Sequence, residues 1–252
     1  MFLLQVILEL SGLKNSSRSI KIISTGNEEL DRRIGEGVPK PSLIVIEGEN
    51  GSGKTTLTSQ LTYGACTSGL NCAFLTTEDI PQRIIKWARS ISIGLDQYFL
   101  KGKLKVYSLP RATETLTEEK ATEHIDHLIS FFKSKSKVFD FIAVDSLSFL
   151  TVRSRRDVMD LFLTIKKTNF AAENIIVVTL HSDTLDKELK KYAISLCDIY
   201  YSLVNGEVAG RSVKVLKILK ARGVPVVPEA AVAFEVDPAF GIKVVPIAVA
   251  KV

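Results

Sequence analysis

The stretch GENGSGKTT at residues 48–56 is the part of the chain whose residue types and spacing point most directly to chemistry. It fits the pattern G-x-x-x-x-G-K-[ST], follows the apolar run SLIVIE at residues 42–47 and opens a segment with helical periodicity. Glycines in such a loop let backbone N–H groups converge on phosphate oxygens, and the helix N-terminus adds a partial positive charge. The stretch therefore predicts a nucleotide-binding phosphate loop, the Walker A motif.

The polar residues of this loop have distinct expected roles toward Mg-ATP. The Lys54 amine can bridge the β- and γ-phosphates, the Thr55 hydroxyl can ligate Mg²⁺, and Thr56 can reach the α-phosphate. We expect the backbone of the loop to surround the phosphates. The predicted ATP-binding residues of the loop are Asn50, Gly51, Ser52, Gly53, Lys54, Thr55 and Thr56.

Acidic residues follow two other apolar runs. Asp145 ends the run FDFIAVD, a pattern typical of the Walker B carboxylate that reaches Mg²⁺ through water, although strands also end in Asp where it serves as a turn residue. Glu78 follows CAFLTT and could orient or deprotonate an attacking water, with Asp79 beside it as a second catalytic candidate. The alternative is that Asp79 caps the helix opened by Pro81, while Glu78 favours the positive end of that helix.

The elements that must position these residues alternate along the chain. Apolar runs at 42–47, 72–77, 104–109, 139–146 and 174–180 read as buried parallel strands, since they are nearly continuous in Val, Ile, Leu and Phe. Helical segments are expected from about Lys54 to Cys66, from Pro81, after an N-cap at Thr117, and from about Arg155 to Lys167.

After Leu196 the pattern changes to strand-like runs separated only by turns, which predicts an antiparallel extension at the edge of the sheet. The expected fold class is α/β, a mostly parallel twisted sheet with helices on both faces and an antiparallel C-terminal β extension. We expect one ATP-binding domain over residues 20–252. Residues 1–19 are an apolar segment of uncertain role, too short to span a bilayer.

Composition adds few constraints. The 252 residues carry a formal net charge of +5, with the excess spread along the chain, and the run KSKSK at 133–137 is typical of a solvated helix end. The three cysteines contain no C-x-x-C pair and lie in apolar contexts, which favours buried, reduced thiols. His124 and His127 lie one helical turn apart without an evident third ligand, so a surface helix is the favoured interpretation over a metal site.

The segment STGNEELDRRIGEGVPKPSLIVIEGENGSGKTT, together with TTEDIPQRIIKWARS, KILKARG and FEVDPAFGIKV, resembles RecA-superfamily ATPases of the KaiC-like branch. The likeness covers about residues 20–246. Within that branch the single-domain length, TGNEELDRR and TTE are similar to the FlaH (ArlH) group of archaellum-motor accessory ATPases. The resemblance implies a RecA-like P-loop NTPase core, adds Ser90 to the ATP-binding residues, and places Lys220 and Arg222 in trans contacts with a neighbour's phosphates.

The same resemblance implies partners and a location. These are a ring of the chain with itself, expected to be a hexamer, the motor ATPase FlaI and the membrane-anchored scaffold FlaX. The ring would lie in the cytoplasm, at the cytoplasmic face of the membrane-embedded motor, with only indirect membrane contact. A nucleic-acid partner is disfavoured because the positive charge is spread along the chain.

One departure from KaiC-like hydrolases bears on catalysis: Asp79 stands in place of the second of two adjacent glutamates. Asp is one methylene shorter, and a misplacement on the order of 1 Å can lower a rate about a hundredfold. We therefore expect hydrolysis to be weakened, with binding intact. Two other functions stay open: a RecA-like DNA-binding recombinase using the basic segment SFLTVRSRR at 148–156, and a working KaiC-like ATPase or autokinase.

Overall fold

The computed structural model describes residues 20–77, 79–109, 117–147, 155–182, 184, 186–208 and 210–246. The strands are β1 (Lys21–Ile23), β2 (Val38–Lys40), β3 (Ser42–Gly48), β4 (Cys72–Thr76), β5 (Leu104–Ser108), β6 (Phe141–Asp145), β7 (Ile175–His181), β8 (Ile199–Val208), β9 (Arg211–Ala221), β10 (Ala231–Asp237) and β11 (Gly241–Val245). The helices are α2 (Glu28–Ile34), α3 (Lys54–Thr67), α4 (Pro81–Ser90), α5 (Leu95–Leu100), α6 (Glu118–Lys135), α7 (Arg155–Ala172) and α8 (Lys187–Leu196).

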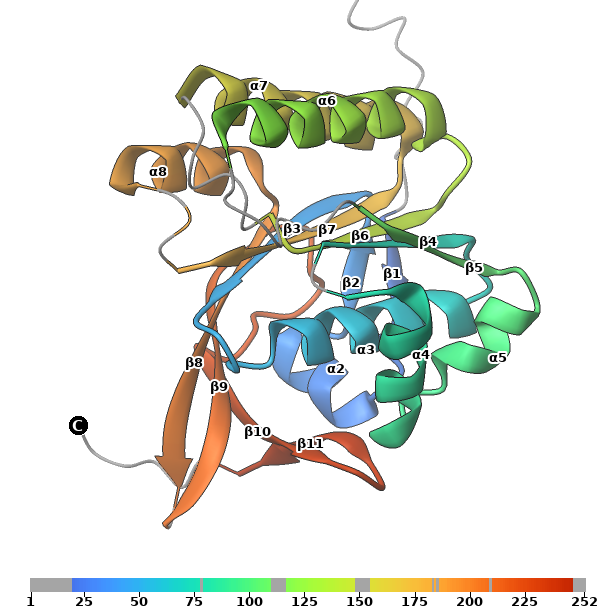
Figure 1. The fold of residues 1–252 in the computed structure, drawn as a ribbon. Coiled ribbons are helices and arrows are strands. Elements are labelled where there is room, and N and C mark those ends of the chain that lie inside the picture. The colour runs from blue at the N-terminus through green and yellow to red at the C-terminus, as the bar shows by residue number, and fades with distance from the viewer. Residues whose placement is uncertain are drawn as a thin grey trace, which may run out of the picture.

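A nine-stranded sheet in the order β11-β10-β9-β8-β3-β7-β6-β4-β5 forms the centre of the fold. Helices α6, α7 and α8 cover one face, and α2 to α5 lie on the other (Figure 1). The strands from β8 to β5 run parallel, whereas β9, β10 and β11 pair antiparallel. The predicted α/β class and the antiparallel C-terminal extension are confirmed, with one refinement: β8 still pairs parallel with β3, so the antiparallel part begins at β9.

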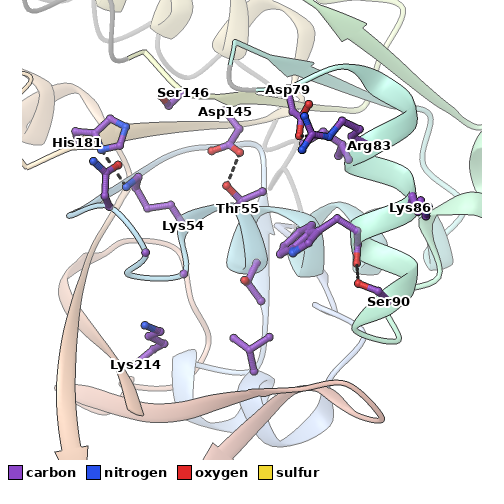
Figure 2. Close-up of a pocket in the computed structure, with 17 residues that line it drawn as sticks. Lys54, Thr55, Asp79, Arg83, Lys86, Ser90, Asp145, Ser146, His181 and Lys214 are labelled. Carbon is purple, nitrogen blue, oxygen red and sulfur yellow. Dashed lines mark hydrogen bonds and ion pairs between the residues drawn. The ribbon is translucent and has the colours of Figure 1, made fainter. Parts of the chain in front are cut away.

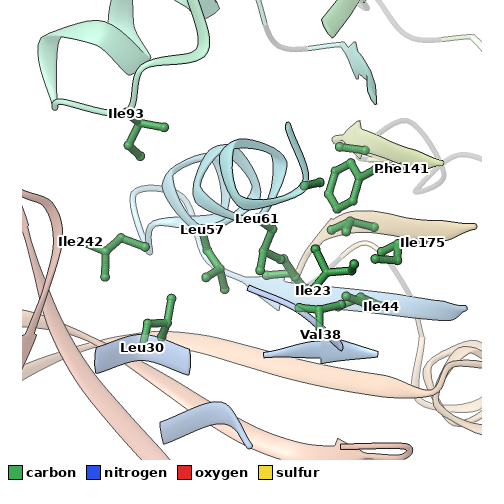
Figure 3. Packing of buried hydrophobic residues seen from close by; sticks show 14 of the residues in the cluster. Ile23, Leu30, Val38, Ile44, Leu57, Leu61, Ile93, Phe141, Ile175 and Ile242 are labelled. Carbon is green, nitrogen blue, oxygen red and sulfur yellow. The ribbon is translucent and has the colours of Figure 1, made fainter. Parts of the chain in front are cut away.

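The two faces of β3 explain its continuous apolar sequence. Ile44 and Ile46 pack into the cluster under α3, while Leu43 and Val45 pack into the cluster under α7 and α8. Figure 3 shows the first of these clusters, with Leu57 of α3 above the sheet. A strand covered on both sides has no solvent face to fill with polar residues, so the alternation of an exposed strand is absent.

The predicted starts of α3, α4, α6 and α7 are confirmed. Thr117 caps α6 as predicted, since its hydroxyl oxygen accepts a hydrogen bond from the Lys120 N–H at 3.3 Å. Helix α7 continues to Ala172, five residues beyond the predicted end at Lys167. Helices α2, α5 and α8 were not predicted from the sequence.

The segment TGNEELD at residues 25–31, which precedes the central sheet, contacts several elements. The Asn27 side chain caps α2 at the Leu30 N–H and donates to the carbonyl oxygen of Ile242 on β11 at 2.6 Å. Asp31 accepts from the Thr25 N–H at 2.8 Å. The backbone at Ser24 and Thr25, just before α2, lies very close to α3: a Cβ added to Gly64 would lie 2.2 Å from the Ser24 carbonyl oxygen. This segment therefore fixes the position of the helix that carries the phosphate loop.

Other sequence-based predictions have mixed outcomes. Cys66, Cys72 and Cys197 are free and buried, as predicted. His124 lies on α6 but is buried, so it belongs to the core-facing side rather than to an exposed surface, and burial lowers its pKa. None of the helices in the described part of the chain combines the length and the apolar composition that a membrane span requires. The segment 1–19 lies outside those residues.

Candidate functional site

A cavity of about 830 Å³ opens at the carboxyl ends of the parallel strands (Figure 2). It lies where β3 ends between β7 and β8, with the phosphate loop and the start of α3 on one side and α4 on the other. Ligands of open α/β sheets bind at such strand ends. Residues from the loop, α4, β6, β7, β9 and β10 converge here: Asn50, Gly51, Gly53, Lys54, Thr55, Thr56, Asp79, Arg83, Ile84, Lys86, Trp87, Ser90, Asp145, Ser146, His181, Lys214 and Val236.

Glycines shape the loop at three points. Gly51 and Gly53 have φ values of 71° and 99°, which side-chain-bearing residues rarely adopt. No atom lies within 4 Å of a Cβ built on Gly51, so the loop backbone is open to the cavity at that point. At Gly48 a Cβ would lie 2.4 Å from the Ser52 hydroxyl and 2.7 Å from the Leu203 carbonyl oxygen. Only glycine fits where β3 turns into the loop.

Lys54, the first residue of α3, turns its amine back into the loop. The Nζ atom donates to the carbonyl oxygens of Gly48 at 2.9 Å and Glu49 at 2.8 Å, and lies 3.3 Å from His181 Nδ1. Lys54 is only 7% exposed. A cation is thus held at the base of the loop and is linked to the end of the neighbouring strand β7.

Thr55 and Asp145 meet across the floor of the cavity. The Thr55 hydroxyl donates to Asp145 Oδ2 at 2.7 Å (Figure 2). The Thr179 hydroxyl donates to Oδ1 of the same carboxylate at 2.7 Å. Asp145 is 1% exposed. The structure therefore places the two residues predicted to act on Mg²⁺ side by side, although they are 90 residues apart in the chain. Hydroxyl and carboxylate oxygens are ligands that Mg²⁺ prefers.

Helix α4 forms the opposite wall, and it corrects one prediction. Asp79 does not cap α4. Because Pro81 takes the first helical position, the N-cap residue is Ile80, whose apolar side chain makes no cap hydrogen bond. The Asp79 carboxylate instead accepts from the Ile80 N–H at 2.8 Å and forms an ion pair of 3.4 Å with Arg83. Glu78 lies outside the described residues.

Two further lining residues of α4 lie one turn apart. Ser90 donates its hydroxyl to the Trp87 carbonyl oxygen at 2.7 Å, so the structure places this predicted ATP-binding residue on the cavity wall. Trp87 is the only tryptophan in the chain. Its indole, with Ile84 and Val236, gives this end of the cavity an apolar surface.

The charges of the lining residues favour an anion. Lys54, Arg83, Lys86 and Lys214 stand against the carboxylates of Asp79 and Asp145, an excess of two positive charges among the Lys, Arg and Asp side chains. A polyphosphate is the kind of ligand that such a site attracts.

Sequence reasoning missed several residues of this site. His181 directly follows the apolar run of β7, and polar residues at strand ends are the signal that could have identified it. Arg83, Lys86, Trp87 and Lys214 carry no such signal, since they lie within a helix or strand and are brought to the cavity by packing.

The two residues predicted to act across a subunit boundary lie elsewhere. The Lys220 amine donates to the carbonyl oxygens of Ile194 at 2.5 Å, Ser195 at 3.3 Å, and Cys197 at the end of α8. Burial lowers the pKa of this amine. Arg222 is exposed just past the end of β9. Neither residue lines the cavity, so their trans contacts stay a prediction.

Comparisons with known proteins agree with this geometry. A model of the KaiC ATPase family matches residues 23–249. The archaeal flagellar ATP-binding protein FlaH of Sulfolobus acidocaldarius is 36% identical over 230 residues, covering 91% of this chain and 99% of that protein. FlaH of Methanocaldococcus jannaschii is 26% identical over 228 residues, covering 88% and 94%. The crystal structure of flagellar accessory protein FlaH from Methanocaldococcus jannaschii has a TM-score of 0.79 at 24% identity, over 90% of this chain and all of that chain, and shows the same fold.

Proposed function

Because this chain belongs to the KaiC ATPase family, we propose that it is an ATP-binding subunit of the archaellum motor that acts by holding Mg-ATP more than by hydrolysing it. The names of its FlaH relatives, archaeal flagellar ATP-binding proteins, support the link to the archaeal flagellum and to ATP. The resemblance further suggests a hexameric ring at the cytoplasmic face of the motor, docked to the ATPase FlaI and held by the scaffold FlaX.

One observation carries the proposal: the loop with Lys54 at its base faces the Thr55–Asp145 pair in a cavity with excess positive charge. Backbone N–H groups of the loop would hold the phosphates, and the Lys54 amine would meet the terminal phosphates. Thr55 would ligate Mg²⁺ directly, and Asp145 would orient its water ligands. Bound Mg²⁺ would neutralise part of the phosphate charge.

Holding ATP is sufficient to switch an assembly. A ligand shifts a conformational equilibrium by its differential affinity for the two states. A roughly hundredfold preference for a docking-competent form is worth about 2.7 kcal/mol, within the range of known coupling free energies. No phosphate needs to be cleaved for that shift, so a weak hydrolytic site is compatible with the role.

The first prediction concerns hydrolysis. We expect phosphate release by the isolated protein to stay near background while ATP is bound, because Asp79 is short and its carboxylate is engaged by Arg83 and the Ile80 N–H. Asp79→Glu should raise the rate if reach is the limiting defect. Bound nucleotide and released phosphate are measured on one sample with ATP and Mg²⁺. Asp96→Glu on α5, whose carboxylate pairs with Arg89 away from the cavity, is the control and should change nothing.

Turnover of a few per second by the unmodified protein alone, as typical enzymes show, would refute the holding role and make the protein a working ATPase.

The second prediction concerns assembly. ATP should promote formation of a ring. Arg222→Ala should weaken this effect, because the exposed Arg222 guanidinium would contact the phosphates of ATP bound to the neighbouring subunit. Sedimentation with and without ATP reports the mass of the particle. Lys217→Ala, which removes another exposed cation of the same region, serves as the control.

An unchanged mass with ATP, in the parent and in Arg222→Ala alike, would exclude nucleotide-driven assembly.

The segment SFLTVRSRR, on which the DNA-binding alternative depends, lies outside the described residues except for its last two, whose side chains are not described. A salt-dependent shift with single-stranded DNA would instead favour the recombinase alternative.

A further inference from the structure

Glu47 is a buried carboxylate in an otherwise apolar row. On β3 it follows Leu43 and Val45 on the face covered by α7 and α8, where both of those residues are fully buried. Glu47 itself is 5% exposed. Burying a charge among apolar side chains is costly unless the charge is paired, so packing alone does not account for an acidic residue here.

Both oxygens of this carboxylate are occupied. Lys190 on α8 forms an ion pair with Oε1, and the Tyr200 hydroxyl on β8 donates to Oε2 at 2.6 Å. Burial, and then the bond to Glu47, raise the pKa of Tyr200, so the phenol stays protonated and keeps donating. Three elements, β3, α8 and β8, therefore meet at one side chain.

This cluster lies at the root of the phosphate loop. Glu47 directly precedes Gly48, and the carbonyl oxygens of Gly48 and Glu49 both accept from the Lys54 amine. Gly48 pairs with His181 on β7 and Leu203 on β8. A shift at the end of β3 would therefore move the loop backbone and the Lys54 amine together.

We propose that Glu47 is a positioning residue for nucleotide binding: with Lys190 and Tyr200 it forms a clamp that fixes the end of β3, so that the loop is already arranged for phosphate. The inference rests on the proposed ATP binding. Precise sites need such a supporting layer, because a loop that must be ordered on binding loses affinity by the cost of that ordering. Through this clamp the position of α8 would also affect ATP affinity, although α8 supplies no lining residue of the cavity.

The test neutralises the ion pair without leaving a lone buried charge. In Glu47→Gln/Lys190→Met the amide still accepts from Tyr200, while the attachment to α8 is lost. We expect ATP affinity, measured by calorimetric titration of the full chain with Mg-ATP, to fall about tenfold. The melting temperature should change by no more than about 3 °C, because Lys190 is partly exposed and replacing both partners of such an ion pair by neutral residues is often close to neutral.

A matched ion pair provides the control. Lys166 on α7 pairs with Asp198 at 2.7 Å, at the amino ends of the same two strands, and Asp198 also accepts from the Leu43 N–H. Lys166→Met/Asp198→Asn should leave ATP affinity unchanged whatever its effect on melting. Equal loss of affinity in both double variants would mean general destabilisation and would overturn the clamp, as would parent-like binding by Glu47→Gln/Lys190→Met. Absence of ATP binding in the parent would instead refute the proposed function.

Discussion

Replacing Lys54 by alanine is expected to lower ATP affinity by about a hundredfold or more. The amine is the cation at the base of the loop, almost buried, and it also joins the two carbonyl oxygens of Gly48 and Glu49. The substitution removes both a charge-assisted bond to the phosphates and a brace within the loop. Trp87, the only tryptophan, lines the cavity, so its fluorescence can report binding directly.

The control for this experiment is Lys217→Ala, because Lys217 lies on β9 with its side chain exposed and outside the cavity. It should bind ATP as the parent does. Since the loss of Lys54 could perturb folding, the melting temperature is measured in parallel. A folded Lys54→Ala variant with the parent's affinity would show that the phosphate loop is not the nucleotide site.

Gly64→Ala is expected to have the largest effect on stability, a loss of about 4 kcal/mol in the free energy of unfolding. The new Cβ would lie 2.2 Å from the Ser24 carbonyl oxygen, and 2.3 Å and 2.5 Å from the backbone carbon atoms of Thr25. Backbone atoms cannot rotate away as a flexible side chain can. Either α3 or the turn before α2 must move, and both are held by their own contacts, including the bond from Gln60 to the Thr25 carbonyl oxygen.

Chemical denaturation measures this loss, and a fall of roughly 10 °C in melting temperature accompanies it. Thr67→Ala, at the exposed end of the same helix, is the matched control and should stay within about 0.5 kcal/mol of the parent. Because α3 begins at the phosphate loop, any folded Gly64→Ala protein should also bind ATP less tightly. A stable variant with normal binding would show that the turn and helix can separate at little cost.

The sequence alone was sufficient for the features encoded by local order. The phosphate loop needs glycine at particular backbone angles and a lysine at the first turn of a helix, and both conditions are met within nine residues. The alternation of apolar runs with helical segments determined the parallel sheet, since buried strands and amphipathic helices have different periods. The parallel sheet also predicts that Thr55 and Asp145 lie close together. Parallel strands end at the same edge of a sheet, Asp145 ends β6, and Thr55 lies just after the loop that follows β3.

The exact wall of the cavity was beyond such reasoning. Trp87 and Lys86 lie within a helix, and Lys214 lies within a strand; their sequence neighbourhoods look like those of any partly exposed element. Whether such a side chain reaches the cavity depends on how α4 packs and how the β8–β9 hairpin crosses the sheet. Helix packing and sheet register are set by many distant contacts at once, which no short window contains.

Tertiary structure also decided which groups within the chain the charged side chains contact. The family resemblance of KILKARG implies a contact of Lys220 with a neighbouring subunit, which stays a prediction. Within the chain, the Lys220 amine donates to carbonyl oxygens at the end of α8, a common place for a cation because the last carbonyl groups of a helix lack partners. Asp79 and Glu47 show the same principle. A charged side chain pairs with the groups that lie within its reach after folding. The sequence therefore determined where these two carboxylates lie along the chain. Only the packed structure determined that Asp79 pairs with Arg83 and Glu47 with Lys190.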